Sequence, residues 1–198
     1  MIEKRIDLNK LIEQGDIYKD IKLLRNIQVG EDAISVDEVE FKYVVVLSQT
    51  CDLERIYDKN PNSVLSVLVA PLFLLEQFKK GTYLDFVGIQ TEEIKKDRSL
   101  KPYINGEKPR YYVVNLDDKT KLQNSLIDSF VVDFKYFFTA DMSQFSKEKY
   151  VSSIKPFYRE ELSHNFASYL SRIGIPVVSG DDKSRWLYEV IFINIMLF

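Results

Sequence analysis

The chain has 198 residues, enough for one domain with an appended subdomain or for two small domains. Its formal net charge is −3, whereas nucleic-acid binders usually carry a basic excess, so the overall charge does not favour nucleic acid as a partner. One cysteine excludes an internal disulfide, and one cysteine with one histidine does not suffice for a zinc site. We therefore expect neither a metal nor a cofactor.

Neither end of the sequence predicts a membrane segment. The N-terminal letters MIEKRIDLNKL contain no uninterrupted apolar run, so no signal peptide is expected. The C-terminal letters WLYEVIFINIMLF are apolar but contain Glu189, and a membrane span needs roughly 20 residues. Together with the single cysteine, this predicts a cytoplasmic protein.

The first half of the chain predicts mainly strands. In 15–24, Ile17, Lys19, Ile21 and Leu23 alternate on one side of a strand. The strongest strand is 38–48, which is rich in β-branched and aromatic residues. Other segments expected here are a short helix at 3–14, a turn at 29–35 and a loop at 57–63.

The middle of the chain predicts more strands around one charged segment. Strands are expected at 64–72, 110–116 and 127–138, and a short helix at 73–81 that ends at Gly81. Residues 91–108 are charged and predict an exposed excursion with local helix that could act as a lid.

The clearest helix follows Pro156, which suits a first helical turn, and is stopped by Gly174 and Pro176. His164 points to the side opposite the apolar face. That face is formed by Tyr158, Leu162, Phe166, Tyr169, Leu170 and Ile173.

A polar break directly after the strongest strand is the predicted functional edge. Cys51 is either a thiolate nucleophile or a small half-buried residue, and the adjacent Asp52 together with a distant His164 favours the structural role. Gln49 and Asp52 must find partners, which are either turn amides, a ligand or a facing cation.

Two arginines of the C-terminal segment complete the candidate site. Arg159 or Arg172 is expected within reach of Asp52, since the helix needs a sheet face to cover its apolar stripe and an arginine there would pair with the carboxylate. The candidate ligand- or partner-binding residues are therefore Gln49, Cys51, Asp52, Arg159 and Arg172.

The first 75 residues resemble PemK/MazF-type toxins. The letters GDI at 15–17, VVVLS at 44–48 and VLVAP at 67–71 are similar to the strand starts of those small SH3-like barrels, which cleave RNA. The catalytic Arg-Pro of the toxins corresponds here to Lys42-Tyr43, so the resemblance implies the barrel geometry without the ribonuclease residues.

About 130 residues resemble a group of bacterial proteins with no established activity. Their pattern is SQxCDL, VLVAP, a Tyr-rich strand and PyRExLxxxFxxYxxRxGxP. It matches Ser48–Leu53, Val67–Pro71, Arg110–Val114 and the segment from Tyr158 to Pro176. This resemblance implies a barrel with a helical tail.

The sequence therefore predicts an α+β fold, with a small curved antiparallel β-barrel over 1–140 and a helical C-terminal segment over 141–198. A binding or regulatory module is the expected function, acting with a partner protein or a small ligand, and the neighbouring genes are one place to look for the partner. The alternative is a toxin-like endoribonuclease with altered catalytic residues, in which Arg159 or Arg172 replaces the lost arginine.

Overall fold

The structure is a computed structural model that describes residues 2–3, 12–29, 34–53, 66–95, 100–115 and 129–171. It is an α+β fold built on a mostly antiparallel sheet, as the sequence predicts. The strands are β1 (Ile2–Glu3), β2 (Asp16–Val29), β3 (Ile34–Val46), β4 (Ser66–Leu74), β5 (Tyr111–Asn115), β6 (Ser129–Asp133), β7 (Phe138–Asp141) and β8 (Tyr150–Ile154). The helices are α2 (Leu75–Lys80), α3 (Lys101–Ile104) and α4 (Pro156–Ser171), with short 3₁₀ turns η1 (Asp85–Val87), η4 (Phe134–Tyr136) and η5 (Met142–Gln144).

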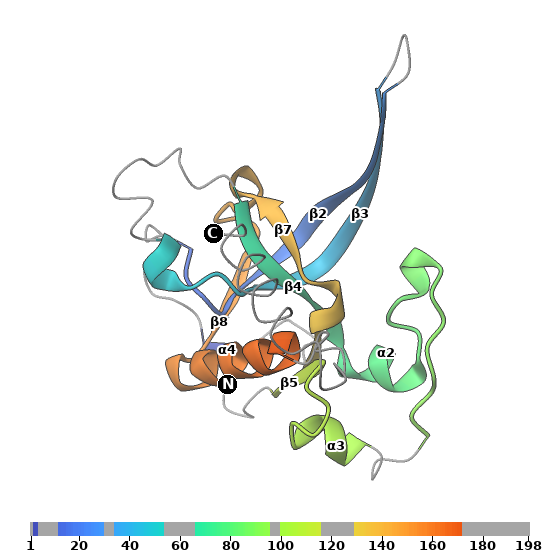
Figure 1. Ribbon diagram of the computed structural model, residues 1–198, viewed down its shortest axis with the longest axis vertical. Helices are drawn as coiled ribbons and strands as arrows, with labels where there is room; N and C mark the ends of the chain where they lie inside the picture. Colours follow the sequence, from blue (N-terminus) through green and yellow to red (C-terminus); the bar gives the residue numbers. More distant parts are fainter. Residues whose placement is uncertain are drawn as a thin grey trace, which may run out of the picture.

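The strands form one sheet of eight, in the order β1-β8-β2-β3-β4-β6-β5, and β7 pairs with β4. Within the described part of the chain this path does not close, so the sheet is open. Strands β2 and β3 extend together as a two-stranded ribbon well beyond the rest of the sheet (Figure 1). Helix α4 lies across the body of the molecule, on the side away from the ribbon (Figure 1).

The end of β3 (Val44–Val46) reads as an unbroken apolar run because both faces of the sheet are covered there. Val44 and Val46 face the α2-side core, whereas Val45 and Leu47 face the α4-side core. The α2-side core comprises Ile12, Tyr18, Ile21, Phe41, Val44, Val46, Leu53, Val67, Val69, Phe73, Phe78, Tyr83, Leu84, Val113, Val131, Phe138 and Ala140. The α4-side core comprises Ile2, Ile17, Val45, Leu47, Ala70, Leu72, Tyr112, Val114, Phe130, Val132, Phe134, Ile154 and Leu162.

The predicted one-sided alternation in β2 is wrong. Ile17 belongs to the α4-side core, whereas Ile21 and Leu23 pack against the α2-side core, and Lys19 is exposed. Between them, Asp20 adopts a left-handed φ of 55°, which breaks the regular two-residue period. The strand can therefore contribute to both cores.

Strand β4 changes neighbours along its length. One edge pairs with β7 at Ser66–Val69 and with β6 at Leu72–Leu74, because β6 and β7 follow one another across the interrupting turn η4. The other edge pairs with β3 only where Val69–Pro71 face Val44–Val46. The predicted single strand at 127–138 is thus two strands with a 3₁₀ turn between them.

Two further predictions need correction, and a third is not tested. The segment 141–198 is not purely helical, because β8 pairs with β1 and β2 and the sheet therefore continues past residue 140. Most of the predicted helix at 3–14 lies outside the described residues, but Glu3 is in a strand and Glu13 is not helical. The loop predicted at 57–63 also lies outside them.

Helix α4 largely follows its predicted face. Leu162 is fully buried, and Tyr158, Phe166 and Tyr169 pack against the α4-side core. Leu170 is 41% exposed, so the covered stripe is narrower than predicted. Ile173 lies beyond the described part of the chain. Among the described residues, no helix is long and apolar enough to cross a membrane.

Candidate functional site

The polar break after β3 forms a rim (Ser48–Leu53), of which 50–53 is helical. The hydroxyl of Ser48 accepts a hydrogen bond from the Leu68 backbone N–H at 2.8 Å. The hydroxyl of Thr50 accepts one from the Gln14 backbone N–H at 3.0 Å. These two side chains join the rim to the neighbouring chain segments and are therefore structural.

The three rim residues predicted to be functional are all exposed: Gln49, Cys51 and Asp52. The half-buried position predicted for Cys51 is wrong, because its thiol points outward and lies 3.6 Å from the Gln49 Oε1 atom. Within the described chain, the Asp52 carboxylate accepts no hydrogen bond and forms no ion pair. Among the described residues no turn amide donates to Asp52, and the residues from 54 onward lie outside the described chain.

Arg159 is bound elsewhere, and its predicted pair with Asp52 does not form. Its Nη1 atom lies 2.8 Å from the Glu13 carboxylate, and its Nη2 atom lies 3.9 Å from that of Glu3. Its Nε–H donates to the Ile154 carbonyl at 2.6 Å. The guanidinium is thus held by the fold. Arg172 lies outside the described residues.

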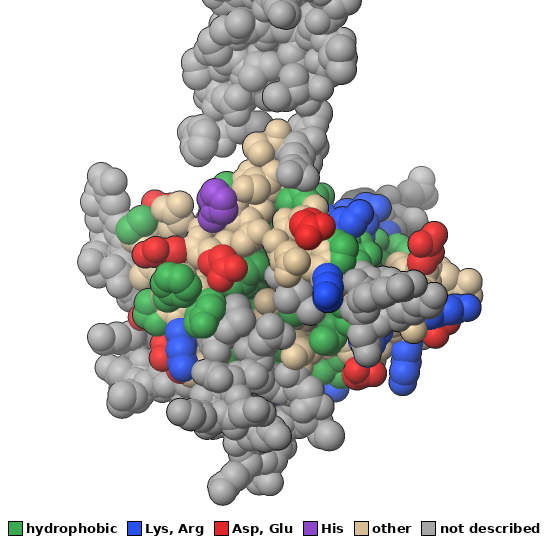
Figure 2. All heavy atoms as spheres, turned by 90° about the horizontal axis from the view of Figure 1, so that it is seen from below, with side chains coloured by type: hydrophobic (Ala, Val, Ile, Leu, Met, Phe, Trp, Pro, Cys, Tyr) green, Lys and Arg blue, Asp and Glu red, His purple; other side chains and the backbone are tan. Residues whose placement is uncertain are grey.

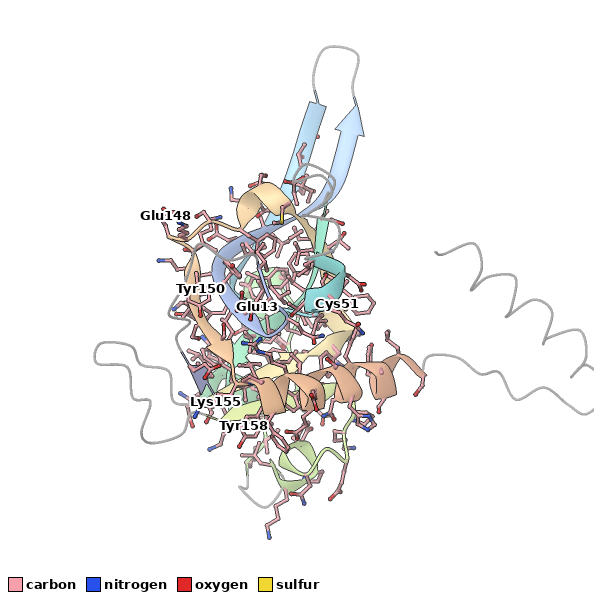
Figure 3. The ribbon with its side chains drawn as sticks, turned by 90° about the vertical axis from the view of Figure 1, so that its left-hand side faces the viewer. Glu13, Cys51, Glu148, Tyr150, Lys155 and Tyr158 are labelled. Carbon is pink, nitrogen blue, oxygen red and sulfur yellow. The ribbon has the colours of Figure 1, made fainter. Side chains whose placement is uncertain are left out.

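The turn before β2 connects the rim to α4. Gly15 adopts a φ of 83°, and a Cβ atom there would lie 2.8 Å from Arg159 Cγ, so the position requires glycine. The buried Asp16 accepts hydrogen bonds from the Ser153 hydroxyl and from the Glu13 backbone N–H. In Figure 3, Glu13 lies between the helical turn that carries Cys51 and the strand that carries Tyr150, with α4 passing below. The helix and the rim therefore both contact this turn, the helix through Glu13 and the rim through Gln14.

A second region is a cleft of about 460 Å³, which lies at the end of the β3–β4 ladder opposite the rim. It is bounded by β3, by β4 and by the segment from α2 to η1. Its lining residues are Glu40, Phe41, Lys42, Tyr43, Leu72, Phe73, Leu74, Gln77, Thr82, Tyr83, Asp85 and Phe86.

The cleft opens at the edges of two strands. Four successive residues of β3 (Glu40–Tyr43) and three of β4 (Leu72–Leu74) line it. Successive side chains of a strand point to opposite faces, so a cavity that touches every one of them must run along the strand edge. The ladder between β3 and β4 is confined to Val44–Val46, and in the described chain no strand pairs with β3 at Glu40–Tyr43 on this side.

The two strands separate directly after Pro71. It lies opposite Val44 as the last residue of β4 that is paired with β3. The Leu47 N–H donates to the Leu68 carbonyl and hydrogen-bonded pairs alternate along an antiparallel ladder, so Val44 and Pro71 form a non-hydrogen-bonded pair and the missing N–H of Pro71 does not weaken this ladder. Beyond Pro71, β4 continues with β6 on its opposite edge and leaves the edge of β3 open.

Aromatic rings form the walls of the cleft. The Phe86 ring centroid lies 5.7 Å from that of Phe41 and 6.4 Å from that of Phe73. Phe86 is nevertheless 52% exposed, which is unusual for a phenylalanine within an aromatic cluster. The Tyr83 ring packs 4.8 Å from Phe73, also centroid to centroid.

A buried ion pair supports the wall that carries Tyr83. Asp133 is fully buried and accepts two hydrogen bonds from Arg110, at 2.7 Å from Nε and 2.6 Å from Nη2. The Tyr83 hydroxyl donates to the same carboxylate at 3.1 Å. Burial, followed by the negative charge of Asp133, raises the pKa of Tyr83 well above its ordinary value. Tyr83 is therefore a neutral hydrogen-bond donor at physiological pH.

Sequence reasoning missed the cleft and the Arg110–Asp133 pair. No local signal in the sequence marks the cleft, because it depends on where the pairing of β3 with β4 stops. No spacing in the sequence connects Arg110 with Asp133, which the antiparallel pairing of β5 and β6 brings together.

No feature points to a metal or nucleic-acid site. The described residues contain no group of three or more histidine, cysteine, aspartate or glutamate side chains that could hold a metal ion. On the face in Figure 2, acidic and basic side chains are interspersed and no continuous basic surface is visible. Comparison of the chain with protein-family models and with curated proteins gives no match.

Proposed function

We propose that this chain is a binding module that receives a partner protein in the cleft between β3 and β4. One observation carries the proposal: two strand edges that no strand of the described residues pairs with face a cleft whose walls are aromatic and partly exposed. Exposed aromatic side chains beside open polar backbone are typical of surfaces that bind polypeptides.

We do not propose the endoribonuclease alternative. It required Arg159 or Arg172 as a free cation in place of the toxin arginine, and Arg159 is engaged by two carboxylates and a carbonyl oxygen. The similarity to SH3-like barrels of the PemK type remains part of the proposal for the fold, supported by the curved antiparallel sheet and by the Gly15-Asp16 turn that opens β2. A cytoplasmic location and a partner encoded by a neighbouring gene remain predictions.

Site-specific crosslinking tests the proposed function. A photoreactive phenylalanine analogue replaces Phe86 in one variant and Phe157 in another, and both are expressed in the host cells. Phe157 is the matched control, because it is 75% exposed but lies on α4, outside the cleft. A discrete protein should crosslink to position 86 and not to position 157.

The crosslinked protein is then purified, and its affinity is measured against the Phe86→Ala and Phe157→Ala variants. Loss of a central aromatic contact should weaken binding at least about tenfold for Phe86→Ala, with Phe157→Ala unchanged. Equal crosslinking from both positions, or equal affinity of both variants, would contradict a partner in the cleft.

A further inference from the structure

We infer that the ligand of the cleft is an extended polypeptide segment that pairs with the open edge of β3 as an added strand. This inference rests on the proposed function and specifies its binding mode. It starts from the backbone, because the side chains alone would equally suit a small apolar molecule.

The open edge supplies the hydrogen bonds. Along a strand, alternate residues direct their N–H and C=O groups toward each edge, so Glu40–Tyr43 offer about two residues' worth of donors and acceptors to the cleft. Strand β2 occupies the opposite edge of the same residues, which fixes their extended conformation before any ligand arrives. An added strand therefore meets a preorganised template.

The protein protects a comparable edge elsewhere. On β2, the Gln144 side chain pairs with the backbone of Lys22, accepting from its N–H at 2.8 Å and donating to its carbonyl at 3.0 Å. A side-chain amide thus occupies the position of a neighbouring strand. At Glu40–Tyr43 no side chain of the described residues does this, which distinguishes the β3 edge as open.

The walls determine which side chains the added strand should carry. Its side chains would alternate between the two sides of the cleft, one lined by Phe41, Phe73 and Phe86 and the other by Tyr43 and Leu72. Apolar residues suit both sides, and an aromatic residue suits the first, where it can pack edge-to-face against the phenylalanines.

The charges favour a basic ligand. The charged side chains at the cleft are Glu40, Asp85 and Lys42, all exposed, giving two negative charges to one positive. An apolar segment with a lysine or arginine at its flank is complementary to this set, whereas a phosphate-bearing ligand is repelled by both carboxylates.

The test uses a phage-displayed library of random linear peptides of about 10 residues, the upper length of an ordinary strand. The full chain is the bait, and selected peptides are resynthesised for affinity measurement by fluorescence anisotropy. Each peptide is also made with a single backbone N-methyl group at every position in turn. N-methylation removes one N–H donor and leaves the side chain unchanged.

A strand added to β3 predicts a period of two in this scan. Methylation at alternate positions should lower affinity at least about tenfold, and at the positions between them less than about threefold. Phe86→Ala should weaken binding and Phe157→Ala should not, while Glu40→Lys should reduce the preference for basic peptides.

Failure of the inference can be told apart from failure of the proposed function. Peptides that depend on Phe86 but show no period of two, or that bind as helices, would overturn strand addition and leave a binding module. Failure to select any peptide that depends on Phe86 would also overturn it. The crosslinking of a partner from position 86 decides separately whether the cleft binds protein at all.

Discussion

The two ends of the buried part of β3 illustrate opposite uses of polar groups. At the rim, Ser48 and Thr50 accept backbone hydrogen bonds, and the adjacent turn ties Glu13 to Arg159. At the cleft, no strand in the described part of the chain pairs with one edge of Glu40–Tyr43. The rim has the more conspicuous sequence motif, yet the cleft has the backbone groups that a ligand could bind.

The difference shows that polarity in a sequence does not by itself mark a binding site. A buried polar group without a partner costs about 1–3 kcal/mol, so most of the polar residues near a core are already engaged. Binding sites are found where the fold leaves polar groups accessible to a ligand. Here the cleft opens where the pairing of β3 with β4 stops.

The largest expected effect concerns the ion pair beneath the cleft wall. Asp133→Ala should lower the free energy of unfolding by about 3–5 kcal/mol, because it leaves Arg110 and the Tyr83 hydroxyl without their shared partner. Urea unfolding followed by circular dichroism measures the change.

Asp141→Ala is the matched control for this variant. Asp133 and Asp141 each cap a 3₁₀ turn by accepting the backbone N–H two residues on, but Asp141 is exposed. Its loss should cost clearly less than the loss of Asp133, because an exposed cap is replaced by water. Equal costs for the two variants would mean that the buried pair adds nothing beyond capping.

The second prediction tests how tightly the rim turn is packed. Gly15→Ala should destabilise by more than the roughly 1–2 kcal/mol that a left-handed conformation costs an L-residue, since its Cβ also meets Arg159. Gly88 has a similar φ of 74°, and a Cβ atom added there would have nothing within 4 Å. Gly88→Ala should therefore show only the cost of the left-handed backbone conformation. Thermal unfolding of both variants gives the difference, and no difference would contradict close packing of Arg159.

The third prediction is a loss of stability at alkaline pH. The pKa of Tyr83 is raised by burial and by Asp133, so the folded protein holds the phenol proton longer than the unfolded chain does. The resulting stabilisation is present below the ordinary pKa of 10.0 and is lost as the pH rises above it. Tyr83→Phe should cost about 1 kcal/mol at neutral pH and flatten this loss.

Urea unfolding at a series of pH values between about 8 and 11 gives the slope for wild type and variant. Tyr111 and Tyr112 also have raised pKa values through burial, so some slope should remain in the variant. An identical slope in both proteins would show that Tyr83 ionises as readily in the folded state as in the unfolded chain.

The smallest effects are expected at the exposed rim. Cys51→Ser and Asp52→Asn should each change the free energy of unfolding by less than about 0.5 kcal/mol, because both side chains are exposed and the one hydrogen bond that either forms within the described chain, from the Cys51 thiol to Gln49, is itself exposed. A cost above 1 kcal/mol, or strong protection of Cys51 from maleimide labelling in the folded protein, would show that the rim is more enclosed than its geometry indicates.

The sequence determined the elements whose pattern is local. The β-branched run of β3, the helix stop at Gly81 with its left-handed φ of 72°, and the apolar stripe of α4 that includes Leu162 were all readable, because backbone preference and side-chain period act over a few residues. The general α+β class followed from these elements.

Tertiary structure decided what depends on contacts between distant segments. The sequence alone does not show whether Arg159 pairs with Asp52 or with Glu13. The pair with Glu13 forms because the turn before β2 places Glu13 beside the helix, although the two residues are 146 positions apart in the chain. Likewise, Arg110 and Asp133 meet only through the register of β5 with β6. The cleft depends on where the pairing of β3 and β4 stops, and strand register is fixed by the packing of the whole sheet.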